Sequence, residues 1–337
     1  MKVDAPLVTA SLAEVPSVAG EIEALGYDGV YTFEGPHDPF FPLALAAEHT
    51  ERIDLATAIA VAFARSPVNL AHIGWDLQAL SRGRAILGLG SQIKPHIEKR
   101  FSMPWSRPAA RMREMVSAIR AVWATWQDGA PLRFEGEIYR LTLMTPFFSP
   151  EPNDFGPARI FVAGVGPGMT EVAGEVADGF LVHPFSSAEF LREVTLPALE
   201  QGFAAGGRTR EGFEISYPAL VVTGATEEDM AAAASVTRAQ LAFYGSTPAY
   251  KVVLDVHGWG DLQPELNRLS KEGRWDVMAT MIDDEMLDTF AVCGAPGEIA
   301  AKLNARYGDL VDRVAFNAPY RADPAAWTDT LAGFGAR

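Results

Sequence analysis

Hydrophobic and polar residues follow two alternating periods along this chain. Short apolar runs predict buried strands, and longer segments whose apolar residues recur every three to four positions predict helices. The predicted strands cover residues 7–10, 29–34, 53–61, 84–90, 159–163, 179–183, 213–223 and 313–317. The predicted helices cover residues 15–25, 42–50, 67–80, 112–126, 169–176, 188–205, 227–243, 296–307 and 324–334. Eight strand-then-helix units predict an α/β fold, a parallel (β/α)8 TIM barrel.

Two segments interrupt this alternation, and we interpret them as insertions. The first, at about residues 128–157, follows the fourth strand and combines a hairpin at 132–141 with a proline-rich loop. The second, at about residues 245–293, follows the seventh strand and contains enough apolar residues to pack as a lid or a dimer surface. No linker rich in Gly, Ser or charge divides the chain. We therefore expect a single domain over residues 1–337.

The charge balance narrows the class of partner. The chain has 28 Lys and Arg against 43 Asp and Glu, a net charge of −15, which repels nucleic acid and anionic membrane surfaces. The sequence has no stretch of ~20 apolar residues, so no membrane span is expected. The single cysteine, Cys293, excludes an intramolecular disulfide and suits a cytoplasmic location. The expected partner is a small-molecule substrate.

One region departs from this acidic balance. The strand at 84–90 ends in Gly88-Leu89-Gly90, and glycines there let a ligand approach the backbone closely. The segment after it has a single acid, Glu98, against six cations, which are Lys94, Lys99, Arg100, Arg107, Arg111 and Arg113. Such a group favours an anionic ligand, although a solvated helix face with a few ion pairs explains the same residues equally well.

In a TIM barrel, chemistry belongs at the carboxyl ends of the strands. After the second strand, Glu34, His37 and Asp38 form a candidate acid/base group, although they also suit an ordinary polar loop. His183 ends the sixth strand, where it is either a donor to a substrate or cofactor or a structural histidine. The fifth strand runs into a glycine-rich turn at residues 163–168. Exposed N–H groups at such a turn favour a phosphate, but glycines also occur there for geometric reasons alone.

Missing motifs exclude other chemistries. No two histidines have the H-x-x-x-H spacing of metal ligands, and no compact carboxylate cluster replaces them, so no metal is expected. The chain has no G-x-S-x-G elbow and no G-x-x-x-x-G-K-[ST] loop, so a hydrolase or nucleotide triphosphatase lacks support. The remaining interpretation is a barrel with a redox cofactor.

Several motifs of the chain match one known family. They are Thr57-Ala58-Ile59, Ala64-Arg65-Ser66-Pro67, the run from Leu80 to Gly90, the hairpin residues 134–139, and residues 163–167 followed by 173–180. Together they resemble the luciferase-like monooxygenase superfamily, over nearly the whole chain. Within it, residues 244–250 and His257-Gly258-Trp259 are most similar to the deazaflavin-dependent branch, the coenzyme F-420 oxidoreductases.

The resemblance implies a flavin-like ring across the strand ends and a non-proline cis peptide bond at Ala58–Ile59. The residues that it implies for cofactor binding are Thr57, Ala58, Ile59, Gln92, Lys94, Arg100, Arg107, Ala163, Gly164, Val165 and Gly166. One departure matters: sugar-phosphate dehydrogenases of the family have Asp-His and Glu where this chain has Glu34-Gly35 and Ile93. This difference puts a sugar-phosphate substrate in doubt.

The hypothesis from the sequence is therefore a coenzyme F-420-dependent oxidoreductase that transfers a hydride between C5 of the cofactor and an organic substrate. The candidate catalytic residues are Glu34, His37, Gln92 and His183. A wall formed by Phe33, Phe40, Phe63, Tyr244 and Trp259 would favour an apolar or aromatic substrate. The alternatives are a monooxygenase that uses reduced FMN, and a noncatalytic flavin-binding or partner subunit. A homodimer is the oligomer we consider.

Overall fold

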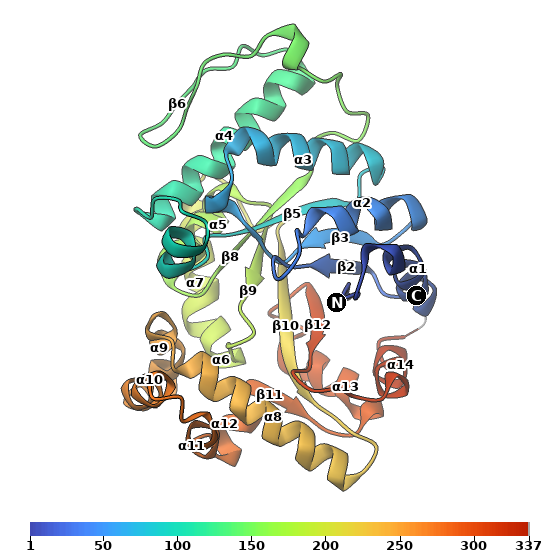
Figure 1. The fold of residues 1–337 in the computed structure, drawn as a ribbon, viewed down its shortest axis with the longest axis vertical. Coiled ribbons are helices and arrows are strands. Elements are labelled where there is room, and N and C mark those ends of the chain that lie inside the picture. Colours follow the sequence, from blue (N-terminus) through green and yellow to red (C-terminus); the bar gives the residue numbers. More distant parts are fainter. Residues whose placement is uncertain (336–337) are drawn as a thin grey trace.

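The computed structural model describes residues 1–335 and shows a closed barrel of eight parallel strands surrounded by helices (Figure 1). The barrel strands, in the order in which they pair, are β1 (Lys2–Pro6), β2 (Gly29–Thr32), β3 (Asp54–Thr57), β5 (Ala85–Gly90), β8 (Arg159–Gly164), β9 (Gly179–Val182), β10 (Glu214–Val222) and β12 (Arg313–Asn317). The ring closes where β12 pairs with β1. The predicted TIM barrel is therefore confirmed.

Helices follow the strands and cover the outside of the barrel. They are α1 (Val15–Leu25), α2 (Phe40–His49), α3 (Pro67–Leu80), α4 (Pro108–Asp128), α5 (Pro167–Val176), α6 (Ala188–Phe190) continued by α7 (Leu196–Ala205), α8 (Glu227–Gly245), α13 (Pro296–Tyr307) and α14 (Pro324–Ala332). Three of the predicted helices have the predicted bounds, namely residues 15–25, 67–80 and 296–307. Gly26 ends α1 at φ 95°, a left-handed conformation that glycine adopts without strain.

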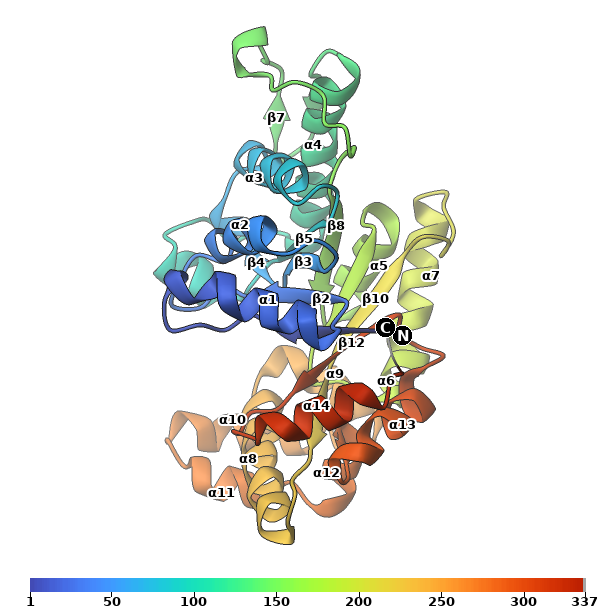
Figure 2. The same cartoon turned by 90° about the vertical axis from the view of Figure 1, so that its right-hand side faces the viewer.

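The two excursions from the barrel lie at opposite ends of the long axis of the molecule (Figures 1 and 2). The first contains a short antiparallel hairpin, β6 (Phe134–Glu135) and β7 (Arg140–Leu141). The second contains α9 (Lys251–Val256), α10 (Leu262–Lys271), α11 (Trp275–Thr280), α12 (Asp284–Phe290) and β11 (Ala291–Cys293). It packs against α8 through an apolar cluster of its own. Within residues 1–335, no helix is both long and apolar enough to cross a membrane.

The first strand was placed wrongly from the sequence. Residues 7–10 are not a strand, and β1 instead covers Lys2–Pro6. The alternation misleads here because Val3 faces the helices and is buried, whereas the charged Lys2 and Asp4 face the inside of the barrel. The predicted strand at 53–61 is also interrupted: β3 ends at Thr57, and β4 (Ala60–Val61) resumes after a break.

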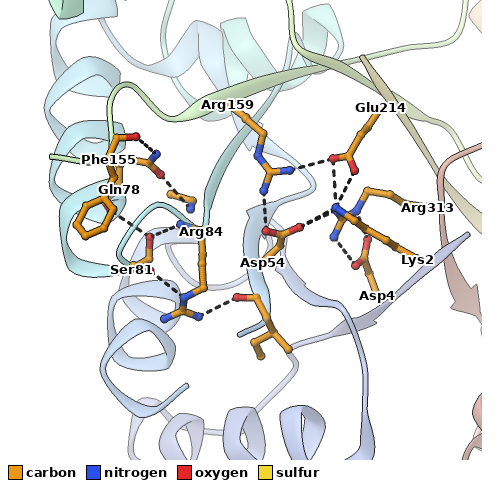
Figure 3. Close-up of polar contacts among 12 residues, drawn as sticks. Lys2, Asp4, Asp54, Gln78, Ser81, Arg84, Phe155, Arg159, Glu214 and Arg313 are labelled. Carbon is orange, nitrogen blue, oxygen red and sulfur yellow. Dashed lines mark hydrogen bonds and ion pairs between the residues drawn. The ribbon is translucent and has the colours of Figure 1, made fainter. Parts of the chain in front are cut away.

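A network of charges closes the amino-terminal end of the barrel, which we call the barrel floor (Figure 3). Its members are Lys2, Asp4, Asp54, Arg159, Glu214 and Arg313. Arg313 is 2% exposed and donates to both carboxylate oxygens of Asp4, at 2.8 and 2.7 Å. Three cations meet three carboxylates, so the buried charges are balanced. Above this floor, Ile86, Phe161 and Leu181 form a separate apolar layer.

Candidate active site at the carboxyl ends of the strands

The barrel wall is reshaped where β3 ends. The Ala58–Ile59 peptide bond is cis, as the family resemblance implied. Thr57 is fully buried, and its hydroxyl donates to the carbonyl of Gly88 (2.7 Å) and accepts from its N–H (2.9 Å). The side chain of Thr57 therefore pairs with β5 as a strand backbone would. Ile59 then lies against Gly90, where an added Cβ would come within 2.7 Å of Ile59 Cδ1.

The loop after β2 supports this bulge. The carboxylate of Glu34 accepts a hydrogen bond from the backbone N–H of Val61 (2.7 Å) and pairs with Arg65 (2.6 Å). The backbone N–H of Glu34 donates to the carbonyl of Ile59 (3.0 Å). Arg65 also reaches Asp38, at 3.1 Å. Glu34, a member of the predicted acid/base group, therefore already has hydrogen-bond and ion-pair partners in and beside the bulge. His37 is exposed and makes no side-chain hydrogen bond within residues 1–335.

Gln92 follows β5 in a conformation that the sequence does not signal. Its φ is 58°, in the left-handed region that residues other than glycine rarely occupy. Its side-chain oxygen accepts from the N–H of Ile93 at 3.0 Å. Strained backbone of this kind concentrates at functional sites. The predicted role of Gln92 in catalysis and cofactor binding stays a prediction.

The six cations after β5 do not form one patch. Arg111 is buried and donates to the carbonyl of Pro104 (2.7 Å) and to the Tyr139 hydroxyl (2.9 Å), and Arg113 pairs with Glu175 (2.6 Å). Arg107 pairs with Glu137 on the hairpin. The remaining three, Lys94, Lys99 and Arg100, lie on the exposed segment directly after β5, where Arg100 also donates to the carbonyl of Gly35 at 2.9 Å. Lys94 also lies 3.8 Å from Glu98, in an exposed ion pair that an anionic ligand could displace, so these three cations are the ones that remain accessible to such a ligand among the described residues of this segment.

The turn from β8 to α5 has the geometry of a phosphate cradle. Residues 163–166 lead into α5, whose N-cap, Gly166, provides no capping side chain. The first N–H groups of a helix have no partner within the helix, so here they are free to bind an anion. A Cβ added at Gly166 or at Gly168 would meet no atom within 4 Å. The backbone is therefore open to a bulky group, and it fits the phosphate of a flavin-like cofactor.

His183 lies at the end of β9, two residues beyond Leu181 and on the same face of the strand. Its Nδ1 accepts from the N–H of Phe185 at 3.1 Å. Its ring packs between two tyrosines, with centroids 4.9 Å from Tyr244 and 4.5 Å from Tyr250. Burial lowers its pKa from 6.5 to about 4, so the imidazole is neutral at physiological pH.

The structure adds two residues that sequence reasoning missed. Asn317 ends β12 and lies near the hydroxyl of Tyr244, which comes from α8. Tyr31, on β2, lies within electrostatic reach of the same hydroxyl. No motif marks either residue, because their elements are far apart in the sequence and converge only when the barrel closes. Of the predicted aromatic wall, Phe40 and Phe63 are buried, whereas Phe33 is largely exposed.

Comparisons with known proteins agree with this fold and identify the family. The family model for luciferase-like monooxygenases matches residues 1–313. An uncharacterized protein of Mycobacterium tuberculosis (strain H37Rv) is 57% identical over 303 residues, which cover 90% of this chain and 89% of that protein. A putative coenzyme F-420-dependent oxidoreductase of the same strain is 32% identical over 292 residues, 81% of each chain.

A solved structure with a similar fold is that of coenzyme F-420-dependent tetrahydromethanopterin reductase from Methanopyrus kandleri. The TM-score is 0.77 at 20% identity, and the match covers 99% of this chain and 96% of that one. The match of the family model over most of the chain leaves the noncatalytic alternative without support. The chain belongs to the luciferase-like monooxygenase family and is an oxidoreductase.

Proposed function

We propose that this protein is a coenzyme F-420-dependent oxidoreductase that transfers a hydride between C5 of the deazaflavin and an organic substrate. The uncapped and unobstructed start of α5, at the carboxyl end of the barrel that also holds the cis bulge, supports a cofactor with a phosphate, and the exposed Lys94 and Arg100 carry the choice of F-420. The 32% identical relative, named as a putative F-420-dependent oxidoreductase, supports the choice of cofactor.

Three parts of the chain would hold the cofactor. The backbone of residues 163–166 would bind its phosphate, because the start of α5 offers free N–H groups and the positive end of the helix dipole. Thr57, Ala58 and Ile59 would support the ring. Lys94 and Arg100 would attract an anionic tail, and Arg107 would do so only in competition with Glu137. When bound, the deazaflavin supplies a carrier of two electrons as hydride, and the protein supplies orientation.

The contacts divide the roles of the candidate catalytic residues. Glu34 is a positioning residue in this proposal, because its carboxylate already accepts from Val61 and Arg65 and thereby holds the bulge. His37 is exposed at the edge of the site and is the proposed acid/base residue. His183 and Gln92 would bind the ring or the substrate rather than exchange protons, since burial keeps His183 neutral.

The second candidate is a monooxygenase that uses reduced FMN. The description of the matching family, luciferase-like monooxygenase, favours it. The phosphate cradle suits both cofactors, so it cannot distinguish them. The exposed Lys94 and Arg100 favour F-420, because its longer anionic tail offers them more negative charge than FMN does.

The test is a titration of the protein with F-420 and, separately, with FMN, followed by tryptophan fluorescence at two salt concentrations. We expect tighter, salt-sensitive binding of F-420. The double variant Lys94→Ala/Arg100→Ala should weaken F-420 at least tenfold, and Lys271→Ala, an exposed lysine on α10, should not. Equal or tighter binding of FMN would favour the monooxygenase, and binding of neither would refute both proposals.

The cradle has its own test with a matched control. Gly168 and Gly297 both follow a proline at the start of a helix, and both have open space where a side chain would be added. A glutamate at either position suits the helix dipole. Gly168→Glu should repel the cofactor phosphate and abolish binding, while Gly297→Glu should leave it unchanged. Equal effects of the two substitutions would remove α5 from the site.

The homodimer and the cytoplasmic location stay predictions. Sedimentation equilibrium of the protein with and without F-420 would test the dimer, and a monomer at all concentrations would refute it.

A further inference from the structure

The N–H donor of the His183 ring has no hydrogen-bond partner in the described part of the chain. Because Nδ1 accepts from Phe185, the proton of the neutral imidazole is on Nε2. Within residues 1–335, no side chain or carbonyl accepts a hydrogen bond from this Nε2–H. His183 directly follows β9, two residues beyond Leu181 of the inner apolar layer, so it stands at the carboxyl ends of the strands, against Tyr244 and Tyr250.

The groups around this donor are polar but uncharged. Tyr244 and Tyr250 pack against the imidazole, and Asn317 and Tyr31 approach the hydroxyl of Tyr244. Burial raises the pKa of both Tyr244 and Tyr250, so their hydroxyls keep their protons. Together with His183, these residues form what we call the neutral wall. Its members are Tyr31 on β2, His183 directly after β9, Asn317 on β12, Tyr244 on α8 and Tyr250 in the turn that follows α8.

The charged groups beside these residues are paired: Asp4, within electrostatic reach of Tyr31, binds Arg313, and Lys251, which follows Tyr250, pairs with Asp255. Glu34 and Arg65 pair with each other behind the bulge, and Arg313 is two layers below Asn317, bound to Asp4 on the barrel floor. A carboxylate or phosphate bound at the neutral wall would lose its hydration and meet no cation. Burying an unpaired charge in this way costs several kcal/mol, whereas a neutral oxygen needs only hydrogen-bond donors.

We infer that the neutral wall is the subsite for an uncharged oxygen of the substrate, a carbonyl or alcohol oxygen that accepts the hydrogen bond of His183 Nε2–H. This inference rests on the proposed function, and it narrows the substrate class to neutral carbonyl compounds or the corresponding alcohols. Carboxylated and phosphorylated substrates are excluded from this subsite. His183 is then a residue that determines specificity.

The experiment uses the full-length protein saturated with oxidised F-420, with histidine labelled by 15N. The probes are cyclohexanone and cyclohexanecarboxylate, which share a ring and differ in charge. We expect cyclohexanone to shift the Nε2 resonance of His183 and to bind at least tenfold more tightly than the carboxylate. Equal or tighter binding of the carboxylate would overturn the inference.

Variants then test the donor itself. His183→Phe keeps the aromatic packing but removes the donor, and it should weaken cyclohexanone about tenfold relative to the unchanged protein when both are saturated with F-420. His183→Gln returns an N–H donor and should restore ketone binding. His72→Phe, a matched histidine that contacts Trp126 on the outside of the barrel, should have no effect. Full ketone binding by His183→Phe would refute the role of the donor.

The failure of this inference can be distinguished from the failure of the proposed function. If F-420 does not bind, the same titration is repeated on the cofactor-free protein. A shift of the His183 signal by cyclohexanone would then support the subsite although the cofactor assignment is wrong. Absence of any shift in both forms would overturn the subsite.

Discussion

The hydroxyl of Thr57 makes both hydrogen bonds that a strand would make to Gly88, donating to its carbonyl at 2.7 Å and accepting from its N–H at 2.9 Å. The approach is close enough that a Cβ on residue 88 would lie 1.7 Å from the carbonyl oxygen of Thr57. The bulge that shapes the candidate cofactor site therefore depends on a threonine and a glycine on neighbouring strands.

Thr57→Val should show how much this pair contributes. Valine has nearly the shape of threonine, but it leaves the N–H and carbonyl of Gly88 buried without partners, so we expect a loss of about 2–4 kcal/mol in the free energy of unfolding. Thr57→Ser keeps the hydroxyl and should lose about 1 kcal/mol. Urea unfolding measures both. Equal stability of the valine and serine variants would contradict the proposed pairing.

Glu34→Gln should separate support of the bulge from acid/base catalysis. Glutamine still accepts from the N–H of Val61, but it no longer neutralises Arg65. We expect weaker cofactor binding with an unchanged pH profile of kcat, because the carboxylate positions the bulge and exchanges no proton. If the acid limb of the kcat profile disappears, Glu34 is a catalytic acid/base residue as the sequence suggested.

Arg313→Met should destabilise the barrel floor by about 3–5 kcal/mol, because it leaves Asp4 buried without its cation. Arg268 offers a matched control on the surface, where it pairs with Glu265 and Glu272. Arg268→Met should have little measurable effect, since exposed ion pairs contribute little. Unfolding in urea compares the two variants. Similar losses of unfolding free energy at both positions would mean that burial of the floor network does not increase its contribution to stability.

Acid should destabilise the protein partly through His183. The unfolded chain binds a proton at this histidine below pH 6.5, whereas the folded protein does so only below about pH 4, because burial disfavours the charged form. Stability is therefore complete above pH 6.5 and falls as the pH decreases from 6.5 to 4, by about 3 kcal/mol from this group. His183→Gln should flatten the unfolding curve over that interval. An unchanged pH dependence would show that folding does not lower the pKa of His183.

The sequence by itself determined the barrel, because the two periods of its apolar residues alternate eight times. Local signals also placed individual elements well. Proline at residue 67 begins α3 at the predicted position, and glycine at residue 26 ends α1. The glycine-rich turn at 163–166 was identified from its own residues, whereas the cis bond at Ala58–Ile59 was implied only by the resemblance to a known family.

The tertiary structure decided what the charges and the isolated polar residues do. The strand at Lys2–Pro6 was missed because its inward side chains are charged. They can face the inside of the barrel only because β3, β10 and β12 bring residues of opposite charge beside them. The run of six cations looked like one patch, yet Arg111 and Arg113 find partners elsewhere in the fold. The neutral wall around His183 comes from segments spread between Tyr31 and Asn317, and their convergence follows from closure of the barrel, which no local pattern records.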